Sequence, residues 1–326
     1  MKIRENRPWI QFGLISLLAV MGLPGSSTAQ STVMDPVGVT SLTLNPGYTA
    51  IAINMVKPVL WRGLVTAAAT GSLELNGSPV LPASPCYVEI VSGPLEGDRI
   101  DVGSVAGSTV ALNLAAPHNT LTNASVVSAG TQIVIRQHFV LSDFGALLGG
   151  ALQHGPDSSH SDFVSFFSNG FVNYFPYLDG SWYEDFGNIN LADRKILAPG
   201  SGVMYYRYPP AGAARLIVTG DVRANLMRVP LPNGIEMIST GFPISLSPAD
   251  LAMSPPQFVA GDNAFNSDTI ITYDNGFKNH FLYRNGTWYQ DYGNIDPVSD
   301  RPLFGYSASV AFHSFGDKSL DILKPY

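Results

Sequence analysis

The sequence predicts an all-β fold: an N-terminal small barrel or sandwich, followed by a domain of tandem β-meander repeats with pseudo-two-fold symmetry. Charged residues make up only 13% of the chain, which also contains 32 glycines and 24 prolines. Low charge with abundant turn-forming residues is typical of many short strands and few helices. A third observation is a stretch that occurs twice without a gap, at residues 162–190 and 268–296.

The repeated stretch predicts a three-stranded antiparallel meander. Each copy has two tight-turn dipeptides: Asn169-Gly170 and Asp179-Gly180 in the first, Asn275-Gly276 and Asn285-Gly286 in the second. These dipeptides tolerate the positive φ angles of a type I′ hairpin turn. About eight residues with period-two patterning separate the two turns, which is a good strand length.

Alternation between the turns separates the middle strand into two faces. One face is nearly identical in the two copies, and in the first copy it carries Phe171, Asn173, Phe175 and Tyr177. Packing constrains the shape of a side chain more tightly than solvent does. We therefore expect the shared face to be the packed one.

The end of each repeat supplies eight candidate ligand-binding residues: Trp182, Tyr183, Asp185, Asn188, Trp288, Tyr289, Asp291 and Asn294. The aromatic rings are suited to stacking on sugars, and equally to the core, where aromatic side chains contribute most to burial. The Asp and Asn side chains fit either a ligand site or a brace for the following turn. Both interpretations stay open at this point.

Residues 1–29 have the pattern of a secretory signal. A basic start is followed by an apolar run at residues 9–23 and a small-residue cleavage site that ends at Ala29. The run is short for a membrane span, and no second stretch of spanning length follows it. We therefore expect the mature chain to be exported to the periplasm, cell surface or exterior, without a transmembrane segment.

Four segments are expected after the signal. They are an N-terminal β domain at 30–136, the first meander repeat at 137–211, a connector at 212–237 and the second repeat at 238–326. Turn residues divide the first segment into strands at 39–44, 48–55, 59–67, 71–76, 86–92, 98–103, 108–114 and 131–136. A short helix is expected at Ser142 and a strand at 215–219. Each repeat closes with a further strand, at 202–207 and 309–314.

Motifs for chemistry are weak, and we expect no catalytic residue, no metal site and no cofactor. One loop brings together four candidate ligands: His154, Asp157, His160 and Asp162. Their spacing matches no standard zinc pattern, and the matching stretch at 262–268 lacks the spacing of an EF-hand loop. Both stretches are therefore expected to be polar loops. The single cysteine, Cys86, is expected to be a structural residue.

Several short motifs resemble a family of uncharacterised exported proteins abundant in the Verrucomicrobia. They are Asp35-Pro36-Val37-Gly38, Tyr87-Val88-Glu89-Ile90 with Ser92-Gly93-Pro94 and Gly97, and the tandem Asn-Gly-Phe…Trp-Tyr units. The second copy departs from the Gly-rich, Arg-ending close of the family at Phe304-Gly305-Tyr306 and His313-Ser314. The resemblance covers most of residues 35–318 and implies export and a β architecture, with no established activity.

Three functions remain open. The first is an exported, non-enzymatic envelope or extracellular protein, structural or adhesive, with self-association as one mode of assembly. The second is carbohydrate binding through the repeat aromatics, with a polysaccharide or envelope component as partner, which solvent-facing Trp182 and Trp288 would favour. The third is a secreted hydrolase of unknown substrate, which a cleft with convergent Asp and His side chains would favour. The formal net charge of −7 argues against nucleic acid as a partner.

Overall fold

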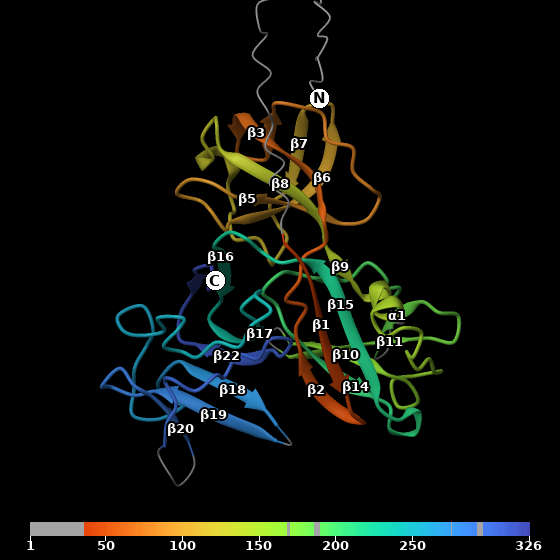
Figure 1. Ribbon diagram of the computed structural model, residues 1–326, viewed down its shortest axis with the longest axis vertical. Coiled ribbons are helices and arrows are strands. Elements are labelled where there is room, and N and C mark those ends of the chain that lie inside the picture. Colours follow the sequence, from red (N-terminus) through yellow and green to blue (C-terminus); the bar gives the residue numbers. More distant parts are fainter. Residues whose placement is uncertain (1–35, 168–169, 186–189, 275, 292–295) are drawn as a thin grey trace, which may run out of the picture. The chain divides into compact units, whose positions relative to one another are not determined.

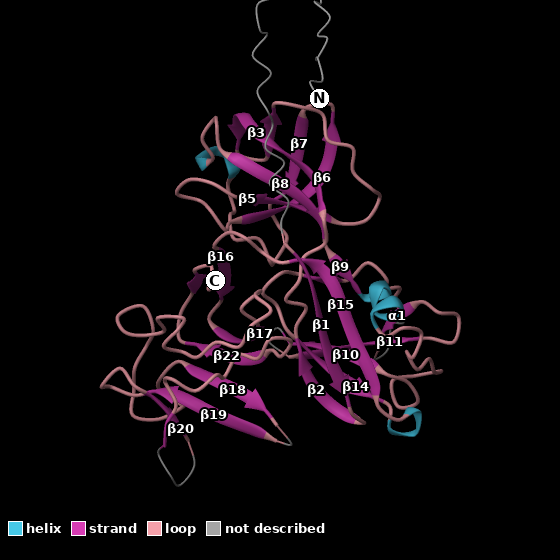
Figure 2. Cartoon of the chain, in the orientation of Figure 1, coloured by secondary structure: helices cyan, strands magenta, loops and turns pink. Residues whose placement is uncertain are grey.

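The chain is mostly β, as its composition predicts. The structure is a computed structural model that describes residues 36–167, 170–185, 190–274, 276–291 and 296–326. Strands and isolated bridges account for 46% of the described residues, and the α-helix found in the described part is the four-residue α1 (Phe144–Leu147) (Figures 1 and 2). All described elements belong to one compact unit.

Six consecutive strands close into an antiparallel barrel, which decides between the barrel and sandwich alternatives. In spatial order they are β3 (Val59–Ala69), β4 (Ser72–Leu75), β7 (Thr109–Asn113), β6 (Arg99–Ala106), β5 (Cys86–Ile90) and β8 (Gln132–Gln137). Alternate residues of β5, β6 and β8 fill the barrel with apolar side chains such as Val88, Ile100 and Ile135. Cys86 is buried among them, in agreement with the structural role expected for it.

The first two described strands pair outside the barrel. The strand β1 (Val37–Leu44) is antiparallel to β15 (Ala214–Asp221), and β2 (Gly47–Ile51) is antiparallel to β14 (Val203–Arg207). All eight strands predicted before residue 137 are present, although two of them join sheets formed much later in the chain. The strands predicted at 202–207, 215–219 and 309–314 are found as β14, β15 and β22.

Each repeat contributes its predicted three-stranded meander to a larger sheet. The five-stranded sheet runs β12 (Trp182–Glu184), β11 (Phe171–Pro176), β10 (Phe163–Phe167), β14 and β2. The six-stranded sheet runs β17 (Gly234–Ile238), β22 (Val310–Ser314), β18 (Thr269–Tyr273), β19 (Phe277–Leu282), β20 (Trp288–Gln290) and β21 (Asp296–Pro297). Matching residues pair in the same register, since Val164 lies opposite Tyr174 and Ile270 opposite His280. The pseudo-two-fold relation between the copies stays a prediction.

Two short strand pairs and three 3-10 turns complete the described part of the fold. The pairs are β9 (Phe139–Val140) with β13 (Ile196–Leu197), and β16 (Met227–Leu231) with β23 (Lys318–Ile322). The 3-10 turns are η1 (Ala124–Val126), η2 (Leu141–Asp143) and η3 (Pro209–Ala211). The helix expected at Ser142 is present as η2 and α1, but its N-terminal hydrogen bond is made by Asp143, whose carboxylate accepts from the Val140 N–H at 2.8 Å.

The expectation that the shared face of the meander is uniformly packed was wrong at the hairpin ends. Phe171 is 57% exposed and its counterpart Phe277 is 61% exposed. Tyr174 and His280, on the opposite face, are buried. The end of each hairpin extends past the core of its sheet, which leaves Phe171 and Phe277 exposed. Farther from the hairpin end, both faces of the middle strand are covered, because each sheet packs against its own core.

The outward side chains of β5 and β8 form a buried group of charges with the end of β15 and the residues that follow it. The Arg136 guanidinium lies 2.7 Å from the Asp221 carboxylate and 3.5 Å from that of Glu89. Glu89 also contacts Arg223 and accepts a hydrogen bond from Asn225 at 3.0 Å. This group, Glu89, Arg136, Asp221 and Arg223, connects the barrel to residues 221–225. Buried ions are stable only when they are paired, so the contact fixes how these segments meet.

The structure does not test the predicted signal sequence or the predicted segment boundaries. The proposed signal sequence falls in residues 1–35, which are outside the described residues. The segment boundaries at 136, 211 and 237 remain predictions. No helix in the described part of the chain is long and apolar enough to cross a membrane.

Replacing Arg136 by Met is expected to lower the free energy of unfolding by about 3–5 kcal/mol, because Asp221 loses its buried partner. Denaturant titration followed by circular dichroism measures the change. Arg284→Met is the matched control, since Arg284 pairs with Asp262 at an exposed site and its loss should cost no more than about 1 kcal/mol. Equal effects of the two substitutions would contradict the structural importance of the buried group.

Candidate metal centre

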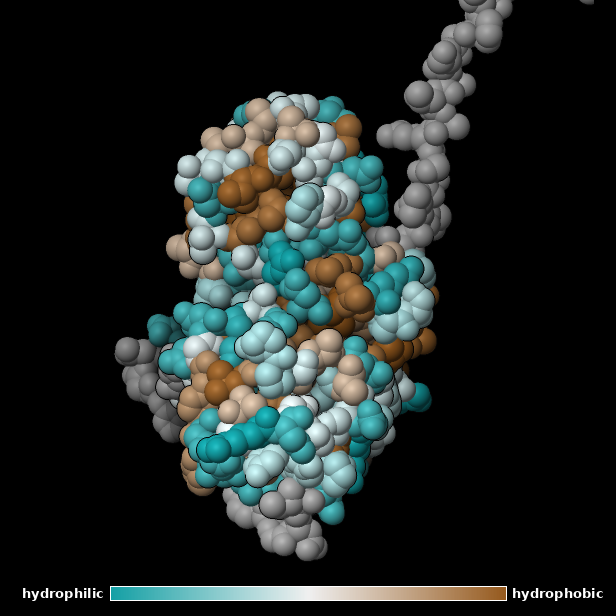
Figure 3. All heavy atoms as spheres, turned by 90° about the vertical axis from the view of Figure 1, so that its left-hand side faces the viewer, coloured by the Kyte–Doolittle hydropathy of each residue, from teal (hydrophilic) through white to brown (hydrophobic). Residues whose placement is uncertain are grey.

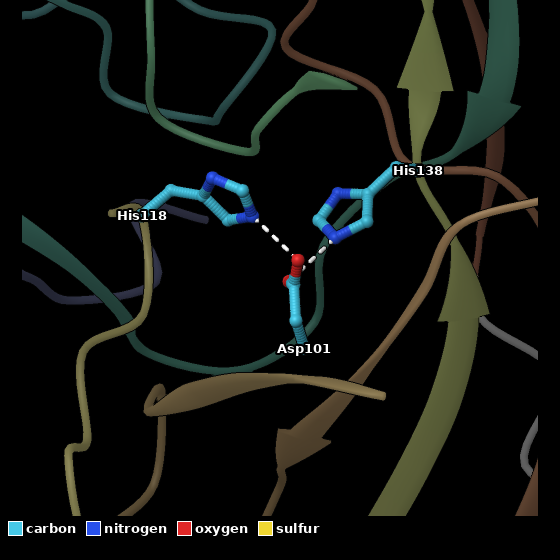
Figure 4. A group of neighbouring side chains, drawn as sticks. All are labelled: Asp101, His118 and His138. Atoms are coloured by element: carbon cyan, nitrogen blue, oxygen red, sulfur yellow. Dashed lines mark hydrogen bonds and ion pairs between the residues drawn. The ribbon is translucent and has the colours of Figure 1, made fainter. Parts of the chain in front are cut away.

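Three side chains that are separated in sequence converge near one end of the barrel. His118 and His138 follow Asp101 by 17 and 37 residues. Their Nε2 atoms each lie 2.8 Å from a different oxygen of the Asp101 carboxylate (Figure 4). The three ligand atoms lie within 4.8 Å of one another, which is close enough to hold one metal ion. We call these residues the Asp–His–His cluster.

Strand pairing places two members of the cluster. In β6, Ile100 points into the barrel core, so Arg99 and Asp101 point outward. Asp101 is directly opposite Tyr87 of β5. His138 comes just after β8, on the same outward side as Arg136, and its backbone N–H donates to the Pro85 carbonyl at 2.9 Å. The alternation of β6 and β8 therefore brings both side chains to one outer face.

His118 is placed by a loop held along β6. The Asn119 side chain accepts a hydrogen bond from the Asp101 backbone N–H at 2.9 Å. The Thr120 hydroxyl accepts from the Arg99 backbone N–H at 2.7 Å, and the Thr120 N–H donates to the Arg99 carbonyl at 3.0 Å. These bonds occupy backbone groups at the start of β6, where the pairing with β7 begins only at Asp101, opposite Asn113. They hold the neighbouring His118 close to Asp101.

Asp101 and His138 have the protonation states that bind metals. Burial alone would raise the pKa of the Asp101 carboxyl, but hydrogen bonds from His118 and His138 together with their charge lower it to about 2. Burial lowers the pKa of His138 below its usual value, and this outweighs the opposing effect of Asp101. At neutral pH the cluster thus contains a carboxylate and a neutral imidazole, which are the forms that coordinate metal ions.

The donor set restricts which ions would fit. Two imidazole nitrogens and one carboxylate oxygen suit Zn²⁺ and neighbouring divalent transition metals better than Ca²⁺ or Mg²⁺, which prefer oxygen ligands. The side chains of Asp101 and His138 are 8% and 1% exposed, and that of His118 is 22% exposed. His138 Nδ1 and the Tyr87 hydroxyl are buried without a hydrogen-bond partner in the described chain. Their rings lie 4.5 Å apart between centroids.

A cavity of about 360 Å³ adjoins the cluster at His118. Its charged and imidazole side chains are those of Arg99, His118, Lys195 and Glu236, and its apolar wall includes Phe166. It therefore joins barrel residues to residues from the first repeat and from β17. A larger hollow of about 600 Å³ lies on the barrel beside Cys86, but Arg194 is the only charged residue in its lining, and that guanidinium is bonded to the Ala83 carbonyl. The smaller cavity is lined by a wider range of charged, imidazole and apolar side chains than the larger hollow.

The tryptophans singled out from the sequence are core residues. Trp182 and Trp288 are each 1% exposed. Trp182 packs against Phe144 with ring centroids 5.7 Å apart. The Trp288 indole N–H donates to the Met253 carbonyl at 2.7 Å. Neither ring presents a face to solvent, so this arrangement favours the packing interpretation over sugar stacking for the two indoles.

The other described candidate residues of the repeats bond to neighbouring residues of the same repeat. The Tyr183 hydroxyl donates to Asp179 at 2.9 Å, and Tyr289 accepts from Asn285 at 3.2 Å. The backbone N–H groups of Asp185 and Asp291 donate to matching asparagine carbonyls, at 2.9 Å in both copies. Asn188 and Asn294 lie outside the described residues. None of the described residues among these candidates lines the cavity.

The loops tested for metal ligands in the sequence have other partners. His160 pairs with Asp157 at 2.7 Å on the exposed surface. Asp162 is fully buried and accepts hydrogen bonds from Arg207 and Tyr205 at 2.5 and 2.7 Å. Its counterpart Asp268 is equally buried and lies 2.5 Å from the Lys318 ammonium. Both carboxylates are buried and brace their repeats, a role that the expectation of polar loops did not include.

The Asp–His–His cluster was missed in the sequence because no local spacing marks it. Asp101 lies in a strand, His118 in the loop after β7, and His138 just beyond β8. The one available signal was alternation, since polar Arg99 and Asp101 interrupt an otherwise apolar barrel strand at outward positions. Such outward charges are ordinarily read as solvent-facing. Only their burial by other segments turns them into a site.

The two core tryptophans give a direct optical test. In a variant with Trp9 and Trp61 replaced by Phe, emission from Trp182 and Trp288 is expected to be blue-shifted and protected from iodide, because both indoles are buried. Soluble polysaccharides should leave this emission unchanged. Quenching comparable to that of free tryptophan, or a saturable glycan-dependent change, would contradict the core assignment.

No protein-family model, curated protein or solved structure matches this chain. The fold and its side-chain geometry are therefore the basis for assigning a function.

Proposed function

We propose that this chain is an exported protein that binds one divalent transition-metal ion, of the zinc class, through Asp101, His118 and His138. The observation that carries the proposal is the convergence of three ligand atoms within 4.8 Å from three separate segments of the barrel. One acidic and two imidazole ligands form a common donor set for catalytic zinc, in which a fourth position stays open for water or a substrate.

Proton positions support the same assignment. A carboxylate only accepts hydrogen bonds, so in the ion-free arrangement each Nε2 carries the proton that it donates to Asp101. A metal ion held by both Nε2 atoms would take the place of these protons, and each neutral ring would then carry its proton on Nδ1. The His138 Nδ1–H then needs an acceptor, and metal-bound histidines usually have one. The Tyr87 hydroxyl, unpartnered in the described chain and next to the His138 ring, is the candidate acceptor.

Among the functions expected from the sequence, this proposal is nearest to the secreted hydrolase. That hypothesis called for a cleft between the N-terminal region and the repeats with convergent Asp and His side chains. The cavity at His118 is lined by Arg99 from the barrel and by Phe166 and Lys195 from the first repeat. A bound zinc ion would lower the pKa of a coordinated water and polarise a carbonyl, which are the effects that metallohydrolases use.

Metal titration tests the proposal. Protein dialysed against a chelator is expected to bind one Zn²⁺ per chain by calorimetry, and Co²⁺ is expected to give visible d–d absorption. His118→Ala should lower the affinity by more than about 100-fold, since loss of an outer-shell partner alone costs about 10–100-fold. His118 is the preferred position because its partial exposure makes the variant less disruptive to the fold than one at His138.

The matched control is His160→Ala, which removes a histidine from the loop that the sequence placed beside other potential ligands. This variant should bind zinc like the original protein, because His160 pairs with Asp157 away from the cluster. Absence of stoichiometric binding, or equal affinity in the two alanine variants, would refute the metal site.

A second candidate function is the structural or adhesive role expected from the sequence. Phe171 and Phe277 occupy matching places at the ends of two hairpins and are both exposed. Large apolar side chains that recur at exposed positions are suited to contact with a partner. On the face shown in Figure 3, hydrophobic residues gather in patches between polar ones. In this proposal the two repeats present equivalent contact points, as their predicted pseudo-two-fold symmetry would provide.

The double variant Phe171→Ser, Phe277→Ser tests this second role. Light scattering at rising protein concentration is expected to show self-association of the original chain and its loss in the double variant, because two apolar contact points are removed. Phe265→Ser is the control, since Phe265 is 86% exposed outside the hairpins. A monomer at every concentration, or the same loss in the control, would count against the hairpin contact.

A further inference from the structure

The cavity at His118 has a charge pattern of its own, independent of any metal ion. Its lining includes the Arg99 guanidinium and the Lys195 ammonium, opposed by one carboxyl group, that of Glu236. Its volume of about 360 Å³ corresponds to roughly a dozen water molecules at liquid density, near the lower end of the range for small-ligand pockets. We propose that this cavity binds a small organic carboxylate, with Arg99 and Lys195 as the partners of the acid group.

Arg99 is a fixed and largely buried cation. The residue is 3% exposed, and its Nη1 donates to the Arg228 carbonyl at 2.9 Å. Its backbone is held on both sides by hydrogen bonds with Thr120. The nearby carboxylates of Asp98 and Asp101 already accept from Arg228 and from the two histidines. The guanidinium is therefore pre-positioned, and an anion in the cavity would supply a charge-assisted hydrogen bond.

Lys195 supplies the second cation from another part of the chain. Its Nζ lies over the rings of Phe166 and Tyr174, 5.2 and 5.4 Å from their centroids. No side chain of the described residues accepts a hydrogen bond from this ammonium group. The rings hold the ammonium in place without neutralising its charge. Lys195 is thus available to an anionic ligand.

Glu236 offsets this positive charge only in part. It is half-buried in β17, and no hydrogen-bond or ion-pair partner is found for its carboxyl group in the described part of the chain. Burial raises the pKa of the Glu236 carboxyl to about 7. Up to that pH a large share of the group is protonated and can donate a hydrogen bond to a ligand carboxylate. The cavity therefore carries net positive charge.

The remaining lining selects an organic acid over a bare anion. Phe166, Ile196, Ile235 and Met237 provide apolar surface next to the charged groups. An inorganic anion would leave this surface in contact with water, whereas an aromatic or branched carboxylic acid would cover it. The proposal does not require the metal, although an ion held by His118 would add positive charge to the same cavity.

Ligand-observed NMR titration of chelator-treated protein tests the proposal with three probes: benzoate, the neutral isostere benzamide, and inorganic phosphate. Benzoate is expected to bind at least about tenfold more tightly than benzamide, since a charge-assisted hydrogen bond contributes about 1.5–3 kcal/mol. Lys195→Met should weaken benzoate binding by a similar factor. Lys278→Met is the control, because Lys278 pairs with Asp274 on an exposed hairpin and should leave binding unchanged.

Glu236→Gln is expected to change the affinity for benzoate in the opposite direction to Lys195→Met. At pH 8 this variant is expected to bind benzoate several-fold more tightly, because it removes the carboxylate of the cavity while keeping the side-chain shape. Equal binding of benzoate and benzamide, tighter binding of phosphate than of benzoate, or no effect of Lys195→Met would overturn the proposal. Because the metal is removed throughout, failure here is separate from failure of zinc binding.

Discussion

The structure depends on one outer face of the barrel, where charged side chains point away from the barrel core and are buried by other segments of the chain. Residues of β5, of β8 and of the first part of β6 alternate between the two faces, so a well-packed apolar interior requires that every second residue there point outward. On this side the outward residues include Glu89 and Arg136, which other segments cover. Ions removed from water need partners, and Asp221 and Arg223 supply them. The barrel is thereby connected to the sheets by pairs that are specific in geometry, where an apolar contact would tolerate sliding.

The candidate site is part of this same constraint. Arg99, Asp101 and His138 occupy outward positions of the face that holds Glu89 and Arg136, and they are covered for the same reason. Water cannot solvate them fully, so their hydrogen bonds and protonation states are set by one another. The result is a rigid group of polar side chains at the edge of a cavity, which is the arrangement that precise ligand binding requires.

Turn chemistry and alternation were sufficient to predict the local structure but not the site. Dipeptides such as Asn169-Gly170 marked the hairpins, and every strand expected before residue 137 is present. Long-range pairing left no such mark: nothing near Val39 indicates that its partner is Thr219. The same limit hid the Asp–His–His cluster, because Asp101 and His138 become neighbours only through pairing around the barrel. Exposure of Phe171 was missed because period-two patterning assigns a face without locating the end of the core beneath it.

The pairing of β1 with β15 and of β2 with β14 has a consequence for the order of assembly. The barrel strands β3 to β8 are consecutive in the chain, so the barrel closes from one uninterrupted segment. The two strands that precede it have partners at residues 203–221, across the whole barrel and the first repeat. Closing such long loops is entropically costly and slow. These two strands are therefore synthesised well before their partners and are among the last to be paired. Until the later segment arrives, their open edges are the part of the chain most prone to pair with another molecule.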